Sequence, residues 1–228
     1  MKKYLTSPLT TPISFLLIWL AWMCFIFVFQ YDALPNILDE ESGYLEFITN
    51  LAYLPLLLAF ICFAKTFWNK SKSSRIDFVL FVALGISAFL RENGIQHWIP
   101  SKDTTAFKSR FFLNPDNPLS EKILAGFLLL LLLAVILYLA VKYTKHLVTS
   151  FFEMNPITWS IATLCSVGVL GKFIDRFPSN YKHSVGVALP EQLRLNLQVM
   201  EETSEILLPL IAAFIIFQYW LLEKTPRN

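Results

Sequence analysis

ILAGFLLLLLLAVILYLAV, residues 123–141, is the stretch that decides the fold class of this chain. It carries no charge between Lys122 and Lys142, and its length matches the roughly 20 residues that a helix needs to cross a bilayer. The chain as a whole is 55% hydrophobic, well above an ordinary soluble domain. Five further apolar stretches approach the same length. The sequence therefore predicts six transmembrane helices, at about 13–31, 47–68, 78–96, 121–143, 157–174 and 203–222.

These stretches predict an all-α, polytopic integral membrane protein, with residues 1–228 forming a single six-helix transmembrane bundle. The first stretch follows Met1-Lys2-Lys3, as in a signal peptide, but no small-residue cleavage pattern follows it, so we expect an uncleaved span. The net charge of +2 gives no indication of nucleic-acid binding. Cys24, Cys62 and Cys165 show no C-x-x-C spacing, which favours small buried apolar residues over a metal or redox role.

The distribution of Lys and Arg predicts the orientation. With six spans both termini share one side, and the short tails and loops of that side are dense in cations, as in the segment from Trp68 to Asp77. The positive-inside rule places such loops in the cytoplasm. The longer connections 32–46, 97–120 and 175–202 then lie outside, facing the periplasm if this is a bacterial inner membrane protein.

Charged residues enter the helices at the outer end of the predicted bundle. Glu46 shares a helical face with Asn50 and Tyr53, although an acid at a helix start is also explained by the helix dipole. The adjacent Arg91 and Glu92 point about 100° apart on a helix, so they need not pair with each other. Gly94 is expected to loosen or end that helix and to bring His97 near the pair, and Glu92 and Gln96 are spaced to share a face. Arg91 could instead snorkel to the headgroups.

The second and third outer connections add further charges. Lys108 and Arg110 lie among aromatic residues in the run Phe107-Lys108-Ser109-Arg110-Phe111-Phe112, which suits either phosphate-bearing lipids or an ordinary membrane-surface belt. Lys172, Asp175 and Arg176 follow Gly168, whose lack of a side chain would allow a neighbouring helix to approach. A local arrangement among these three charges is the alternative.

One long helix is expected over 190–222, with Pro190 at its first turn. It carries Glu201, Glu202 and Glu205 within little more than one turn. Pro209 lacks the N–H that would bond the Glu205 carbonyl, which leaves a free acceptor beside these acids.

This inventory leaves two hypotheses open. Carboxylates on neighbouring helices are typical ligands of divalent cations, and cations beside them would bind a phosphate. In the first hypothesis the protein is a metal-dependent hydrolase or transferase acting on a phosphate-bearing lipid. In the second it is a non-enzymatic assembly partner or small transporter, and its charges form a structural ion-pair network. The roles assigned under the first hypothesis are acid/base chemistry for Glu92, Glu205 and His97, phosphate binding for Arg91, Lys108, Arg110 and Arg176, and metal binding for Glu46, Asp175, Glu201 and Glu202.

The orientation can be tested by labelling. Cysteines introduced at Ser73 and Asp116 should differ towards an impermeant thiol reagent in intact cells, because the two positions lie in loops on opposite sides. Asp116→Cys should be labelled and Ser73→Cys should not. The reverse pattern would place the charged end of the bundle in the cytoplasm.

Overall fold

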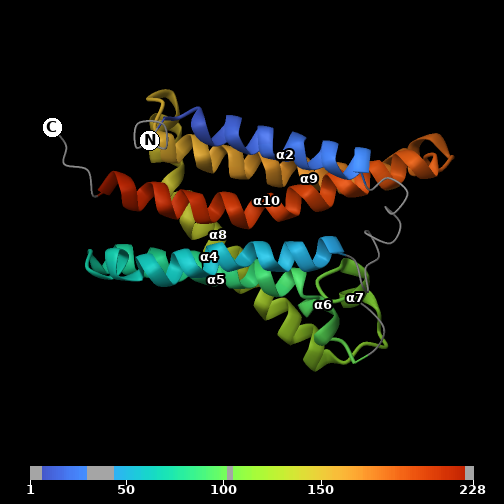
Figure 1. Cartoon of the computed structure of the whole chain (residues 1–228). Helices are drawn as coiled ribbons and strands as arrows, with labels where there is room; N and C mark the ends of the chain where they lie inside the picture. The colour runs from blue at the N-terminus through green and yellow to red at the C-terminus, as the bar shows by residue number, and fades with distance from the viewer. Residues whose placement is uncertain (1–6, 30–43, 102–104, 224–228) are drawn as a thin grey trace. The chain divides into compact units, whose positions relative to one another are not determined.

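The structure is a computed structural model that describes residues 7–29, 44–101 and 105–223; for Phe29, Tyr44 and Glu46 it describes the backbone only. The described residues form helices and contain no strand, so the predicted all-α class is confirmed. Six helices are long and apolar enough to cross a membrane. Figure 1 shows the elements in chain order: α2 (Thr10–Phe29), α4 (Tyr44–Trp68), α5 (Lys72–Glu92), α6 (Ile95–Trp98), α7 (Ser109–Leu113), α8 (Leu119–Phe152), α9 (Pro156–Val185) and α10 (Glu191–Glu223).

The chain divides into two compact units. Unit 1 comprises residues 1–66 and 150–228 and therefore holds α2, nearly all of α4, α9 and α10. Unit 2 comprises residues 67–149 and holds α5, α6, α7 and most of α8. The single bundle over 1–228 and the cytoplasmic termini stay predictions.

Helices α9 and α10 continue far beyond the apolar stretches that predicted them. Their extensions turn the predicted connection 175–202 into a helical hairpin, which Figure 1 shows reaching past the end of α2. Gly186 ends α9 with a φ of 78°, and its N–H donates to the Lys182 carbonyl at 2.9 Å. The long helix expected over 190–222 matches α10, whereas the sequence analysis underestimated α9, because charged residues lower hydropathy without lowering helix propensity.

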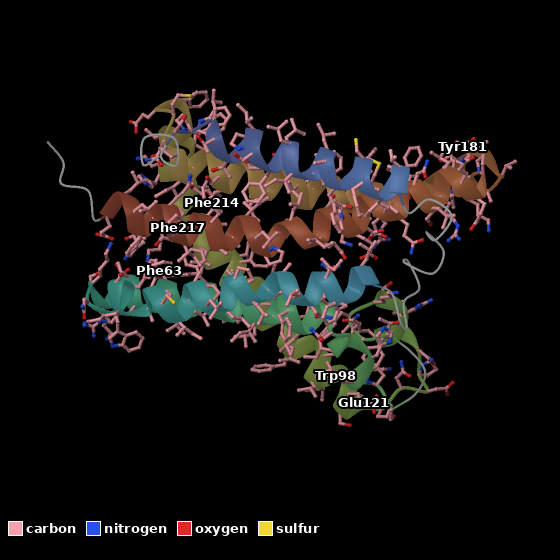
Figure 2. All side chains as sticks on the ribbon, viewed as in Figure 1. Phe63, Trp98, Glu121, Tyr181, Phe214 and Phe217 are labelled. Carbon is pink, nitrogen blue, oxygen red and sulfur yellow. The ribbon has the colours of Figure 1, made fainter. Side chains whose placement is uncertain are left out.

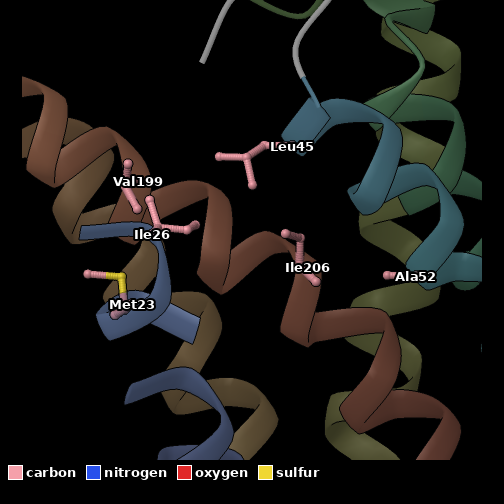
Figure 3. Packing of buried hydrophobic residues seen from close by; sticks show 6 residues of the cluster. All are labelled: Met23, Ile26, Leu45, Ala52, Val199 and Ile206. Atoms are coloured by element: carbon pink, nitrogen blue, oxygen red, sulfur yellow. The ribbon is translucent and has the colours of Figure 1, made fainter. Parts of the chain in front are cut away.

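The apolar core of unit 1 joins α2, α4 and α10. Figure 3 shows its six buried residues, two from each helix: Met23 and Ile26, Leu45 and Ala52, Val199 and Ile206. Helix α9 packs against α10 through two glycines. A Cβ placed at Gly171 would lie 3.4 Å from the Ser204 Cβ, and one at Gly168 would lie 3.7 Å from Leu208 Cδ2. Small residues allow this close approach, as is common between helices in lipid.

A closed ring of hydrogen bonds links α2, α9 and α10. The hydroxyls of Thr11 and Ser160 are 2.6 Å apart, Ser160 donates to Gln218 Oε1 at 2.5 Å, and Gln218 Nε2 donates to Thr11 Oγ1 at 3.1 Å. Ser160 has a single hydroxyl proton, for which the Pro156 carbonyl of its own helix competes at 2.9 Å; when Ser160 donates to Gln218, Thr11 donates to Ser160. All three residues are fully buried. The ring therefore satisfies three polar side chains that no water reaches.

In unit 2, Gly94 separates α5 from α6 with a φ of 73°, as the sequence predicted. The connection to α8 is organised around buried Ala106, Phe111 and Ala125. The side-chain amide of buried Asn117 donates to the Phe111 carbonyl at 2.9 Å and holds the end of this segment.

The ring predicts a specific loss of stability in Ser160→Ala. The variant leaves Gln218 Oε1 without its donor, and interhelical hydrogen bonds in membranes are worth about 1 kcal/mol. The free energy of unfolding in mixed micelles should fall by about that amount. Thr163→Val is the matched control, because the Thr163 hydroxyl donates to the Trp159 carbonyl of its own helix at 2.8 Å. Equal effects in the two variants would show that the ring adds nothing beyond a local bond.

Candidate functional site

On α9, the charges of the candidate site pair with one another. Lys172 Nζ donates to Asp175 Oδ2 at 3.0 Å, and Arg176 Nε lies 3.9 Å from the same oxygen. The Arg176 side chain is 75% exposed and that of Lys172 is 51% exposed. This is the local arrangement that the sequence left as an alternative. A carboxylate already held by a lysine on its own helix is a weaker candidate metal ligand.

On α10, Glu201, Glu202 and Glu205 are half-buried and surround a buried pair, Thr203 and Ser204. Ser204 packs against Gly171 of α9, whereas Thr203 donates to the Val199 carbonyl at 2.6 Å and contacts Met23 of α2 at 3.7 Å. The acids therefore stand next to the positions at which α10 packs against its neighbours.

The antiparallel register of α9 and α10 places two of the candidate residues at one level. Gly171 lies opposite Ser204 and Gly168 opposite Leu208. One further turn of α9 brings Asp175 level with Met200 and Glu201. Within unit 1, the candidate residues of α9 and α10 thus belong to the same part of the helical hairpin.

In unit 2, Arg91 and Glu92 end α5, and Arg91 Nη1 lies 3.7 Å from Glu92 Oε1. The side chains therefore approach each other, although their directions on a helix did not require it. Glu92 and Gln96 do not share a helical face as predicted, because Gly94 interrupts the helix between them. The His97 side chain is exposed on α6, and the backbone N–H of His97 donates to the Gly94 carbonyl at 2.8 Å.

The predicted phosphate-binding residues Lys108 and Arg110 are both exposed at α7. The aromatic residues on either side of them, Phe107 before and Phe111 and Phe112 after, do not all face outwards. Phe111 is 1% exposed and belongs to the buried cluster, and Phe112 packs against that cluster. The two cations are therefore exposed, whereas the aromatic residues beside them are buried or partly buried against Ala106 and Ala125.

The described residues contain no group of three or more His, Cys, Asp or Glu side chains that could hold a metal ion. The side chain of Glu46, assigned to such a site from the sequence, lies outside the described residues, although its backbone belongs to α4. Glu92 belongs to unit 2, whereas Asp175 and Glu205 belong to unit 1. The convergence of these acids on one site, and the divalent metal, stay predictions.

Sequence reasoning missed an ion pair in unit 2 that forms around a buried carboxylate. Lys142 Nζ of α8 donates to both oxygens of Asp77 of α5, at 2.5 and 2.6 Å, and to Ser73 Oγ at 2.8 Å. The Tyr143 hydroxyl donates to Asp77 Oδ2 at 2.5 Å. Asp77 is 5% exposed. Four side chains thus tie α5 to α8 at the end of α5 opposite to Arg91 and Glu92.

Both missed polar groups left a signal in the sequence. Asp77 is an acid between Ile76 and Phe78, close to the start of an apolar stretch, and Gln218 is an amide between two aromatic residues deep in the last stretch. Gln218 lies inside a predicted span, where polar side chains are uncommon and usually have a partner, whereas Asp77 immediately precedes one and gives a weaker signal. The sequence does not indicate which residue bonds to either side chain, because Lys142 is 65 residues from Asp77 and Thr11 is 207 residues from Gln218.

The ion pair predicts non-additive effects on stability. Lys142→Met should lower the unfolding temperature, because it leaves the Asp77 carboxylate buried without its cation. Adding Asp77→Asn should restore much of the loss, since the double variant contains no unpaired charge. Lys145→Met, on the same helix and exposed, should have little effect. Additive losses in the double variant, measured by thermal unfolding in detergent, would contradict a coupled pair.

Comparison with known proteins found no match to a family model, to a curated protein or to a solved structure.

Proposed function

We propose that the protein is a non-enzymatic integral membrane protein that acts as an assembly partner in the bilayer, and that its charged residues hold its own helices in place. The observation that carries this proposal is the local pairing of the α9 charges. Asp175, the acid most suited by position to join a metal site with Glu201, is bonded to Lys172 at 3.0 Å. Its charge is already compensated, which is what a structural network requires.

The polar contacts between helices support the same proposal. The ring of Thr11, Ser160 and Gln218 and the pair of Asp77 with Lys142 each join helices that are distant in sequence. In lipid the hydrophobic effect does not distinguish one helix neighbour from another, so polar contacts and close packing decide which helices associate. A protein that presents a fixed surface to partners within the membrane needs such contacts.

One observation favours a second candidate, the metal-dependent hydrolase or transferase for a phosphate-bearing lipid. Glu201, Glu202 and Glu205 place three half-buried carboxylates within five residues of α10. Acids at membrane depth are costly and often functional. In this reading Glu205 would act as an acid/base or a ligand, Arg176 would bind the phosphate of the substrate, and the site would face the periplasm of a bacterial inner membrane.

Glu205→Gln separates the two functions, because the substitution keeps the volume of the side chain and removes its charge. If Glu205 compensates a charge within the bundle, the free energy of unfolding should fall by about 1–3 kcal/mol, with unchanged bound metal and unchanged cellular lipid composition. The stability is measured in detergent, the metal by elemental analysis of the purified protein and the lipids by mass spectrometry.

Glu191→Gln is the matched control on the same helix. Glu191 forms an exposed pair with Arg194 at 2.6 Å, and exposed pairs contribute about 0–1 kcal/mol. A Glu205→Gln variant as stable as this control, but with lost metal or altered lipids, would overturn the assembly proposal and favour the enzyme.

A further inference from the structure

A groove in unit 1 lies between α4 and α10, with one wall completed by α2. Its volume is about 510 Å³. The lining is apolar and mixes small residues with large ones, so its walls are uneven rather than flat. Figure 2 shows Phe63 of α4 and Phe214 and Phe217 of α10 around the space between these helices. The residues that line it are Phe15, Pro55, Leu58, Ala59, Cys62, Phe63, Leu210, Ala213, Phe214 and Phe217.

The groove has a deep end and an aromatic end. From Pro55 to Phe63 it follows α4 for about 12 Å. At the aromatic end the Phe63 ring lies 5.0 Å from that of Trp220 and 6.4 Å from that of Phe217. Tryptophan is enriched where the hydrocarbon of a membrane meets the headgroups. The groove therefore extends from the level of the headgroups into the hydrocarbon.

A cation stands at the aromatic end. Lys65 lies seven residues after Leu58, so the two occupy nearly the same face of α4, and Lys65 is about 10 Å further along the helix. The side chain is exposed, and among the described residues it forms no ion pair. An apolar groove that ends at a lysine without an acidic partner in the described part of the chain is complementary to a molecule with a hydrocarbon chain and an anionic head.

We propose that this groove binds the acyl chain of one anionic phospholipid, whose phosphate pairs with Lys65. A transmembrane helix fits the groove less well. A helix 10 Å in diameter occupies about 900 Å³ over the same 12 Å, so the groove could hold only about half of its thickness. A single acyl chain is much thinner. The site lies at the opposite end of α4 from Glu46 and is separate from the acids of α10, so the inference goes beyond the assembly function.

The apolar walls alone give little preference for one lipid over another, because the acyl chains of all the surrounding lipids are equally apolar. Selectivity for this lipid should come from the charge. One lysine at a membrane surface favours an anionic headgroup by about fivefold. We therefore expect the protein to retain phosphatidylglycerol in preference to phosphatidylcholine.

Two cysteine variants test the groove. The protein is purified in mild detergent, incubated with an equal mixture of the two lipids, and analysed by native mass spectrometry. Cys62→Trp fills the groove and should reduce bound lipid at least fivefold, whereas Cys165→Trp, at an exposed cysteine of α9 outside the groove, should leave it unchanged. Equal retention in both variants would overturn the proposal. A dimer that Cys62→Trp dissociates, without bound lipid, would instead make the groove an interface between two copies.

Two lysine variants test the headgroup contact. Lys65→Gln should lower the preference for phosphatidylglycerol about fivefold, and Lys72→Gln, another exposed lysine with no part in the groove, should not. Equal losses of preference in both variants would mean that any surface lysine attracts the anionic lipid equally, and would contradict a specific contact between Lys65 and the headgroup.

Thiol protection provides a measurement that does not depend on the folding of a tryptophan variant. In a Cys24→Ser, Cys165→Ser background, Cys62 should react with N-ethylmaleimide several times more slowly in nanodiscs of phosphatidylglycerol than in nanodiscs of phosphatidylcholine. The same rate in both would contradict a lipid bound over Cys62.

Discussion

The structure depends on one constraint, which is that a polar group buried among helices apolar enough to cross a membrane has no water to bond with and needs a partner within the protein. The backbone meets this requirement through long helices. The side chains meet it through a few contacts between helices, of which the ring of Thr11, Ser160 and Gln218 is the clearest. Three helices that are far apart in sequence must come together before any member of this ring is satisfied. Such contacts select one arrangement of helices whose apolar surfaces alone would permit several.

Two kinds of charge pair occur, and they have different consequences. Pairs within a helix, such as Lys172 with Asp175 and Glu191 with Arg194, compensate a charge locally. In both pairs the side chain of the lysine or arginine is about half exposed. The pair of Asp77 with Lys142 joins α5 to α8 around a buried carboxylate. The first kind leaves helix packing open, whereas the second restricts it. Local pairing on α9 therefore counts against a site prepared for a ligand, because the charge of Asp175 is already compensated, whereas the contact that holds helices together is the pair of Asp77 with Lys142.

Polar and apolar features occupy different parts of unit 1. The half-buried acids of α10 lie at the level where Gly171 meets Ser204, whereas the groove lined by Phe63 and Phe217 lies further along the same helix. Pro209 stands between these two regions. Because proline removes one bond of the helical ladder, α10 has a weak point between its charged half and its apolar half.

The sequence by itself determined the class and the approximate spans of this protein. A run such as 123–141 has no stable state in water other than burial, and only a helix satisfies its backbone in lipid. The break at Gly94 was also predictable, because glycine readily takes the positive φ found there. Which polar side chains meet was decided by the tertiary structure alone. Gln218 is visible as an anomaly in its apolar stretch and Asp77 borders one, but their partners are set by helix packing, and packing between apolar surfaces leaves no periodic signal in the chain.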